Sequence, residues 1–289
     1  MASTADAAVP SSNQARHTYV ADGRKVGFFT DPTICIGCKA CEVACKEWNQ
    51  VPADGQVWTG HSYDNSGSLG ASTWRHVKFQ ELGRRLGPQK AGPMTGEAER
   101  PFGWLFLSDV CKHCGNAGCL EACPTGAIMR TEVGSVYVQD DVCNGCGYCV
   151  VGCPFGVIDR RPAPLLGAGG AFKCTFCYDR QKDGLTPACA KACPTESIHF
   201  GPLDELHVRA GERVAALQAR GYADAQIYNP VDTSVGGIHA LFLLLGPPEE
   251  FGLPPRPEVP TIYLRGAWTS AAITSALALL CACLALSAL

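Results

Sequence analysis

The sequence predicts an α+β protein whose small units fold around groups of cysteine side chains, followed by one long apolar helix. The first observation is the cysteine content, since 18 of the 289 residues are cysteine. The second is the spacing of these cysteines, because sixteen of them fall into four runs of four. The third is the end of the chain, where residues 267–289 carry no charged side chain.

Composition excludes several classes of protein. Lysine and arginine number 24 against 27 aspartates and glutamates, which gives a formal net charge of −3. No block of five like charges occurs, so we expect no nucleic-acid partner. A hydrophobic content of 46% excludes disorder for most of the chain.

The four cysteine runs share one spacing pattern. Three of them read C-x2-C-x2-C-x3-C, C-x2-C-x4-C-x3-C-P and C-x2-C-x2-C-x3-C-P, and the fourth has a longer gap before its last two cysteines. The runs are Cys35, Cys38, Cys41 and Cys45; Cys111, Cys114, Cys119 and Cys123; Cys143, Cys146, Cys149 and Cys153; and Cys174, Cys177, Cys189 and Cys193. In bacterial ferredoxins three thiolates of such a run hold one cluster and the fourth holds its neighbour. We therefore predict four [4Fe–4S] clusters, with these sixteen cysteines as iron ligands.

The spacing has a physical reason, and it disfavours two alternatives. A compact loop can aim three thiolates at one cluster, and the x3 step is expected to start a helix that turns the next cysteine toward a second cluster. Zinc sites built from separate C-x2-C pairs do not explain a third cysteine three residues later. Eight disulfides are more than a chain of this size needs, and C-x2-C bridges are readily reduced.

Other residues near the runs have plainer interpretations. His113 lies between two cysteines of the second run, and we interpret it as a neighbour of the ligands rather than a ligand. Cys281 and Cys283 lie in the apolar C-terminal stretch, where we expect small packing residues rather than a lipidation or metal site.

Three lysines flank predicted ligands, namely Lys39, Lys46 and Lys173. A positive charge near a cluster raises its reduction potential, so Lys46→Ala is predicted to lower the potential of one cluster. The alternative is that all three are solvated loop lysines.

The remaining elements follow from local patterns. Residues 1–24 form a polar arm without an apolar stretch, so we expect export, if it occurs, to depend on a partner's signal. Strands are expected at 25–30, 74–82, 104–108, 128–130, 136–138 and 197–200, a helix at 203–220, and a strand or short helix at 239–245. The strands 74–82 and 104–108 should form one hairpin around a Gly/Pro-rich loop, and the strands 128–130 and 136–138 another around Gly134. The apolar face of the helix is expected to consist of Leu206, Ala210, Val214 and Leu217. The six prolines of residues 246–260 predict a stiff spacer outside the core.

The terminal stretch is long enough to cross a membrane. Its 23 residues would span about 34 Å as a helix, against about 30 Å of hydrocarbon. A buried soluble helix is the alternative, but no polar face is present. The stretch contains no histidine for a haem, and the chain shows no dinucleotide fingerprint, P-loop or nucleophile elbow. The sequence therefore predicts an electron carrier with no substrate site.

On these residues the chain resembles the iron–sulfur (β) subunits of membrane-bound formate dehydrogenases, within the four-cluster subunits of molybdenum and tungsten oxidoreductases. The segments that carry the resemblance are CIGCKACEVACKEWN (35–49), CGYCVVGCPFGV (146–157), and ERVAALQARGYADAQIYNP (212–230) with VGGIH (235–239). The proline-rich segment and the single terminal span add to it.

The resemblance implies two pseudo-twofold-related ferredoxin-like domains with insertions, plus one transmembrane helix. The implied parts are an arm (1–24), a domain holding runs one and four (25–110 and 172–245), a domain holding runs two and three (111–171), a spacer (246–265) and the helix (266–289). The implied ligand sets are Cys35, Cys38, Cys41 and Cys193; Cys174, Cys177, Cys189 and Cys45; Cys111, Cys114, Cys119 and Cys153; and Cys143, Cys146, Cys149 and Cys123.

The resemblance also implies a function and partners. The clusters would relay electrons from a molybdopterin-containing, formate-oxidising subunit to a membrane cytochrome b and quinone. Arg265 alone would place the soluble part in the cytoplasm by the positive-inside rule, whereas the resemblance implies the extracytoplasmic side, which we expect. The alternatives are the equivalent subunit of a hydrogenase or of a sulfur, sulfoxide or nitrate reductase, and a free polyferredoxin.

Overall fold

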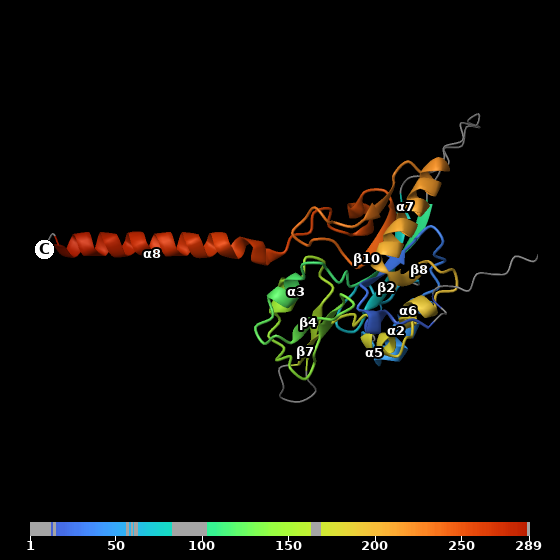
Figure 1. The fold of residues 1–289 in the computed structure, drawn as a ribbon, viewed down its shortest axis with the longest axis horizontal. Coiled ribbons are helices and arrows are strands. Elements are labelled where there is room, and N and C mark those ends of the chain that lie inside the picture. Colours follow the sequence, from blue (N-terminus) through green and yellow to red (C-terminus); the bar gives the residue numbers. More distant parts are fainter. Residues whose placement is uncertain are drawn as a thin grey trace, which may run out of the picture.

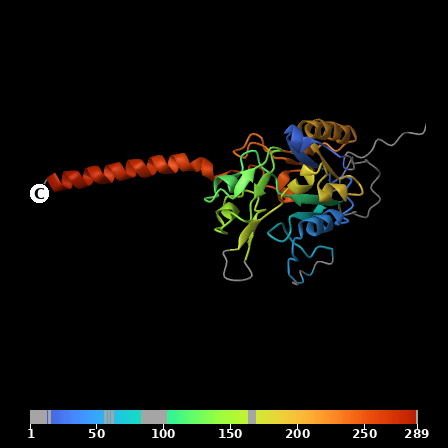
Figure 2. The same ribbon diagram turned by 60° about the horizontal axis from the view of Figure 1, so that its bottom comes forward.

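The computed structural model describes residues 13, 16–55, 58, 60, 63–82, 103–162 and 169–287. Most of the expected arm (1–12 and 14–15), the Gly/Pro-rich loop within 83–102 and the last two residues of the expected span lie outside the described residues. The described chain forms one body from which the long helix α8 (Leu264–Ser287) projects (Figures 1 and 2).

A four-stranded mixed sheet lies at the centre of the main hydrophobic core. Its order is β8-β1-β10-β9, and its strands are β1 (Val26–Thr30), β8 (Ile198–Pro202), β9 (Ala225–Tyr228) and β10 (Ala240–Leu245). β1 is antiparallel to β8 and parallel to β10. The strands predicted at 25–30 and 197–200 are confirmed, 239–245 is a strand, and β9 was not foreseen.

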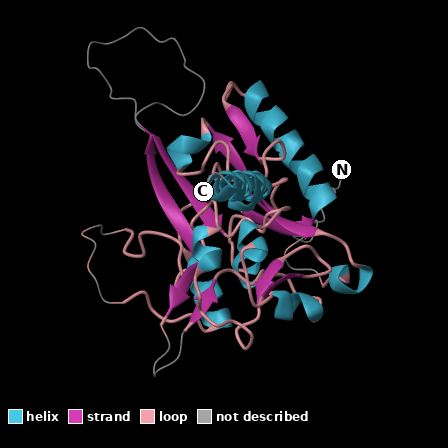
Figure 3. Cartoon of the chain, turned by 90° about the vertical axis from the view of Figure 1, so that its left-hand side faces the viewer, coloured by secondary structure: helices cyan, strands magenta, loops and turns pink. Residues whose placement is uncertain are grey.

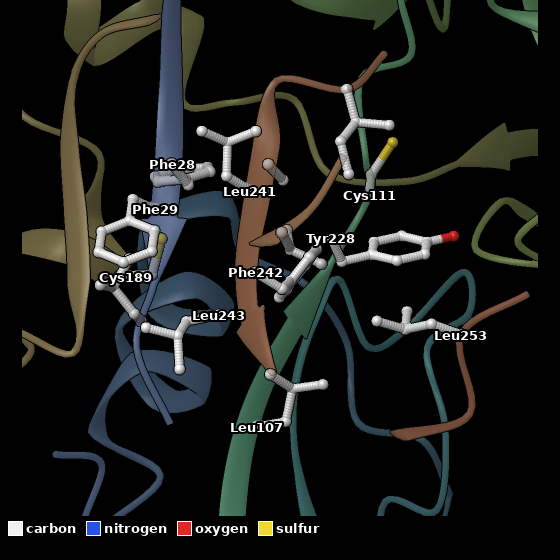
Figure 4. Close-up of a cluster of buried hydrophobic side chains, with 14 of the residues drawn as sticks. Phe28, Phe29, Leu107, Cys111, Cys189, Tyr228, Leu241, Phe242, Leu243 and Leu253 are labelled. Carbon is white, nitrogen blue, oxygen red and sulfur yellow. The ribbon is translucent and has the colours of Figure 1, made fainter. Parts of the chain in front are cut away.

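Apolar side chains on this sheet make the main core. Phe28, Phe29, Leu241, Phe242 and Leu243 are each 1% exposed or less, and they pack together in Figure 4. The helix α7 (Leu203–Ala219) covers the sheet with its buried Leu206, Ala210 and Leu217, as the apolar spacing predicted. Burial of such side chains supplies most of the favourable free energy of folding.

A long hairpin connects the first and second cysteine runs. It pairs β2 (Arg75–Leu82) with β3 (Gly103–Val110), with Arg75 opposite Val110, which confirms the predicted hairpin. β2 packs on α2 (Ala40–Asn49), where the Val77 amide donates to the Glu42 carboxylate. The hairpin is thereby fixed against the first run, and β3 leads directly into Cys111.

Two small hairpins lie between the second and the fourth cysteine runs. The pair β4 (Ile128–Arg130) and β5 (Val136–Val138) turns at Gly134, whose φ of +89° favours glycine, and confirms the prediction. The pair β6 (Asp159–Arg161) and β7 (Gly170–Phe172) was not predicted. The expected domain boundary after residue 171 falls inside β7.

The other helices are short (Figure 3). They are α1 (Tyr19–Asp22), α3 (Gly118–Glu121), α4 (Tyr148–Val151), α5 (Tyr178–Lys182) and α6 (Ala188–Lys191). The third cysteine of each run lies inside α2, α3, α4 or α6. The prediction that the helix starts only after the third cysteine was therefore wrong by a few residues.

The proline-rich segment packs against the body, so the prediction of a spacer outside the core was wrong. It contains the 3-10 helices η1 (Pro248–Phe251) and η2 (Pro260–Tyr263). Phe251, Leu253 and Val259 are at most 3% exposed, and the Tyr228 hydroxyl donates to the Pro254 carbonyl at 2.6 Å. Proline removes backbone donors but leaves the intervening apolar side chains free to pack.

The helix α8 extends away from the body. Its residues are exposed throughout, and its mean hydropathy reaches 2.0 in an 18-residue window. Within the described ranges it is the one helix long and apolar enough to cross a membrane.

Candidate iron–sulfur centres

The structure brings the sixteen cysteines of the runs together in four groups of four. Each group combines three cysteines of one run with one cysteine of another. They are group I (Cys35, Cys38, Cys41, Cys193), group II (Cys45, Cys174, Cys177, Cys189), group III (Cys111, Cys114, Cys119, Cys153) and group IV (Cys123, Cys143, Cys146, Cys149). These groups coincide with the sets that the resemblance implies.

Helix packing produces the crossed grouping. α2 contacts α6, and α3 contacts α4, so the helices of runs one and four lie together, as do those of runs two and three. Glycine allows the closest approach: a Cβ on Gly118 would lie 2.3 Å from the carbonyl oxygen of Gly152. The two helices of the second pair can therefore approach closely enough for each to serve both groups III and IV.

Groups I and III each surround a pocket. The four cysteines of group I line one small pocket and those of group III line another, each partly open to solvent. The four thiols of each group thus face a shared space, at the edge of the buried core to which Cys41 and Cys111 also belong.

Hydrogen-bond donors point at several of the sulfur atoms. The Phe176 amide donates to Cys174 Sγ at 3.3 Å, and the Ala171 amide donates to Cys143 Sγ at 3.4 Å. Ser108 Oγ lies 3.3 Å from Cys41 Sγ. Such donors stabilise a thiolate that binds iron and help to set the reduction potential of a cluster.

Burial makes these thiols poor acids in the absence of a metal. It raises the pKa of Cys41 to about 12, even though Arg75 and Ser108 oppose the shift. Burial likewise raises the pKa of Cys119 to about 12 against the opposing charge of Lys173, and that of Cys45, whose neighbour Cys174 adds to the effect. Iron binding would have to displace these protons, as it does in metalloproteins generally.

The geometry fits a cluster better than zinc or disulfides. All eighteen cysteines are free thiols. Among the described residues, no three His, Cys, Asp or Glu side chains converge closely enough to hold one metal ion. A [4Fe–4S] cluster spreads its ligands, because each of four iron atoms takes one cysteine. Four thiols spaced around one pocket suit that requirement.

The lysines that flank the runs differ in their surroundings. Lys39 pairs with Asp64 at 2.9 Å and Lys46 with Asp54 at 2.5 Å, so nearby carboxylates compensate both charges. Lys173 is 3% exposed and donates to the carbonyls of Val136 and Cys174. The electrostatic neighbours of Lys173 are cysteine thiols of groups II and III.

A buried arginine at the start of β2 was not predicted from the sequence. Arg75 is 1% exposed, and its Nη1 donates to the backbone oxygen of Ser108 at 3.3 Å and to the Ser108 Oγ at 3.2 Å. Its Nε and Nη2 have no acceptor within the described ranges. No sequence signal marks this residue, since a cation opening a strand is usually exposed.

His113 lines the pocket of group III, and the two C-terminal cysteines lie on α8. His113 Nδ1 accepts the Val136 amide at 3.0 Å, and burial lowers the pKa of the ring. This nitrogen is thereby occupied by a backbone hydrogen bond. Cys281 and Cys283 are exposed on α8 and belong to none of the four groups.

The four groups form one row. Cys41 of group I has Cys189 of group II as an electrostatic neighbour, Cys174 of group II has Cys111 of group III, and Cys119 of group III has Cys149 of group IV. Apart from the cysteines of α8, the exposed cysteines are Cys38 and Cys146. The row therefore reaches the surface at group I and at group IV.

Comparison with known protein families gives the class. Two matches, each described as a 4Fe–4S dicluster domain, cover residues 34–127 and 102–203. Each match covers a continuous stretch of the sequence, whereas in the fold the helix of run one packs against that of run four. The chain is thus a 4Fe–4S protein of the dicluster type, which transfers electrons, and the predicted fold class is confirmed.

Individual relatives narrow the class further. The formate dehydrogenase-O iron–sulfur subunit of Escherichia coli is 39% identical over 253 residues, 84% of this chain and 76% of the relative. The formate dehydrogenase iron–sulfur subunit of Haemophilus influenzae is 40% identical over 233 residues, which are 79% of this chain and 68% of the relative. The B subunit of the anaerobic dimethyl sulfoxide reductase of Escherichia coli is 33% identical over 189 residues, which are 65% of this chain and 79% of the relative. The chain belongs to the family of formate dehydrogenase iron–sulfur subunits, which confirms the resemblance.

Proposed function

We propose that this chain is the electron-transfer subunit of a membrane-bound formate dehydrogenase and that each cysteine group holds one [4Fe–4S] cluster. The main support is the single row of groups, I to IV, with surface thiols at both ends. Oxidation of formate to carbon dioxide in a partner releases two electrons and one proton. A row of one-electron centres can carry those electrons through the chain one at a time.

The two ends of the row present surfaces that we assign to different partners. Near group I, Ile36 and Val43 are each 59% exposed, and we assign this face to a molybdopterin-containing catalytic subunit. Near group IV, Tyr148 and Val151 are 62% and 82% exposed, and we assign this face to a cytochrome b subunit that reduces quinone. Exposed apolar residues beside a redox centre suit a protein interface.

The position of α8 supports the second assignment. The hydroxyl of Thr261, in the turn that begins the helix, donates to Glu121 of α3. The membrane-crossing segment therefore starts beside the helix that precedes Cys123 of group IV. We propose that α8 anchors the chain in lipid as a single span and that the soluble part lies on the extracytoplasmic side.

Purification of the intact complex tests the function. We expect iron for four clusters, molybdenum or tungsten in a co-purifying subunit, and formate-dependent reduction of a viologen dye. A complex that reduces dimethyl sulfoxide but does not oxidise formate would support the sulfoxide-reductase alternative. A chain that purifies alone with its clusters would support a free polyferredoxin.

Ligand variants test the direction of the row. Cys146→Ser should stop quinone reduction while formate-dependent viologen reduction persists, because group IV lies at the exit. Cys281→Ser is the matched control, since this cysteine is also exposed but lies in no group. Equal loss of both activities in Cys146→Ser, with iron retained, would contradict the proposed order.

Fractionation tests the anchor and its side. We expect the chain to stay in membranes through high-salt washing and to be cut by protease in spheroplasts but not in inverted vesicles. Release by salt while the membrane partner stays behind would refute the anchor, and protection in spheroplasts would refute the side.

A further inference from the structure

The hairpin between runs one and two carries a positive charge into the interior of the protein. Arg75 opens β2, directly opposite Val110 and hence beside Cys111 at the start of the second run. Its side chain is 1% exposed, and the guanidinium carbon lies 4.7 Å from the centre of the Phe28 ring. A buried guanidinium is costly unless anionic groups compensate it.

The usual compensation is missing for this arginine. Within the described ranges it forms no ion pair with a carboxylate, and its hydrogen bonds go to Ser108 alone. Nε and Nη2 remain without an acceptor, which leaves unsatisfied N–H donors in the interior. Something anionic that accepts hydrogen bonds is therefore required next to them.

The neighbours that act on the Arg75 charge are cysteine thiols of two different groups. They are Cys41 of group I and Cys45, Cys174 and Cys189 of group II. Ser108 connects Arg75 to group I a second time, because its hydroxyl contacts both Nη1 and Cys41 Sγ. The arginine thus has thiols of both groups as neighbours.

We propose that Arg75 is an internal counter-cation shared by the clusters of groups I and II, to whose sulfur atoms its free Nε–H and Nη2–H groups donate hydrogen bonds. A reduced cluster carries one more negative charge than an oxidised one, so a fixed cation between the two favours reduction of both. Arg75 is a positioning residue: it binds no substrate and sets the potentials of the first half of the row. The inference rests on the proposed occupancy of groups I and II.

Potentiometric titration of the intact, anaerobically purified complex tests the proposal. Arg75→Gln removes the charge, and Arg75→Lys keeps the charge but loses the forked donors. Arg161→Gln is the matched control, because Arg161 has no thiol among its electrostatic neighbours. The readouts are iron content and the potentials at which each cluster signal appears in electron paramagnetic resonance spectra.

In Arg75→Gln we expect the reduction equilibria of two clusters to shift roughly tenfold or more toward the oxidised form, about 59 mV lower for a one-electron couple. Arg75→Lys should give a smaller shift of the same two signals, and Arg161→Gln none. The wild-type iron content tests the occupancy of the groups separately from these shifts.

Two results would overturn the proposal. One is an Arg75→Gln complex with full iron and unchanged potentials, which would leave Arg75 as a structural anchor of the hairpin. The other is an equal shift of all four signals. If Arg75→Gln does not retain iron, Arg75→Lys decides, and unchanged potentials in that variant overturn the proposal.

Discussion

Replacement of Gly118 by alanine should disrupt two of the four cysteine groups at once. A Cβ at residue 118 would lie 2.3 Å from the Gly152 carbonyl oxygen and 3.2 Å from a methyl group of Val259. Ordinary contacts begin at 3.4 Å, so α3 or α4 has to move by about 1 Å. Because α3 carries Cys119 of group III and α4 carries Cys149 of group IV, that movement alters both groups.

The expected result is a loss of iron, up to half of the total, from Gly118→Ala. Overpacking of this kind costs about 1–3 kcal/mol of folding free energy. The assay is iron per complex, together with the number of cluster signals after reduction. The signals of groups I and II should survive, since their helices α2 and α6 do not use this contact.

Gly211→Ala is the matched control. Gly211 lies within α7, and nothing lies within 4 Å of a Cβ built there. Alanine is a better helix former than glycine by about 1 kcal/mol, so this variant should keep all its iron and unfold at a slightly higher temperature. A Gly118→Ala complex with wild-type iron and four signals would refute the close-approach argument.

Three further predictions concern charge and protons. Lys173→Gln should lower the potentials of the clusters in groups II and III, while Lys46→Ala should change any potential less, because Asp54 already compensates Lys46; redox titration measures both. Burial lowers the pKa of His199 from 6.5 to about 4. The unfolded chain therefore takes up this proton at a higher pH than the folded chain, and the stability falls as the pH drops through this range. His199→Phe should flatten the dependence of the unfolding temperature on pH. After anaerobic removal of iron, rebuilding of the clusters should be faster at about pH 8.5 than at about pH 6.5, because the raised pKa of thiols such as Cys41 keeps them protonated; iron uptake over time measures this.

The sequence predicted those elements whose signal is local. The hairpins at 74–108 and 128–138 follow from short apolar runs around turn residues, and the face of α7 follows from its spacing. β9 and the pair β6–β7 were missed because segments as short as AQIY and DRR contain too few residues to show an alternating pattern. The choice between strand and helix at 239–245 depended on pairing with β1, far away in the sequence.

The candidate site, too, could be predicted from the sequence only in part. Cysteine spacing indicated three members of each group, because these three belong to one run, whereas the fourth member followed only from the resemblance. Arg75 could not be predicted, since its burial depends on Ser108 and on cysteines of the first and fourth runs. The packed proline-rich segment was missed because its apolar residues contact surfaces that exist only after folding.

The way this segment is fastened has a consequence for electron transfer at the membrane. Val259 lies against Gly118, its amide donates to Ser234 Oγ at 2.7 Å, and the Thr261 hydroxyl donates to Glu121, so the start of α8 is fixed to the body. Tunnelling slows steeply as the gap between donor and acceptor widens. A flexible connection would let that gap vary, whereas with α8 anchored in lipid as proposed, this connection would keep group IV at a fixed height above the membrane.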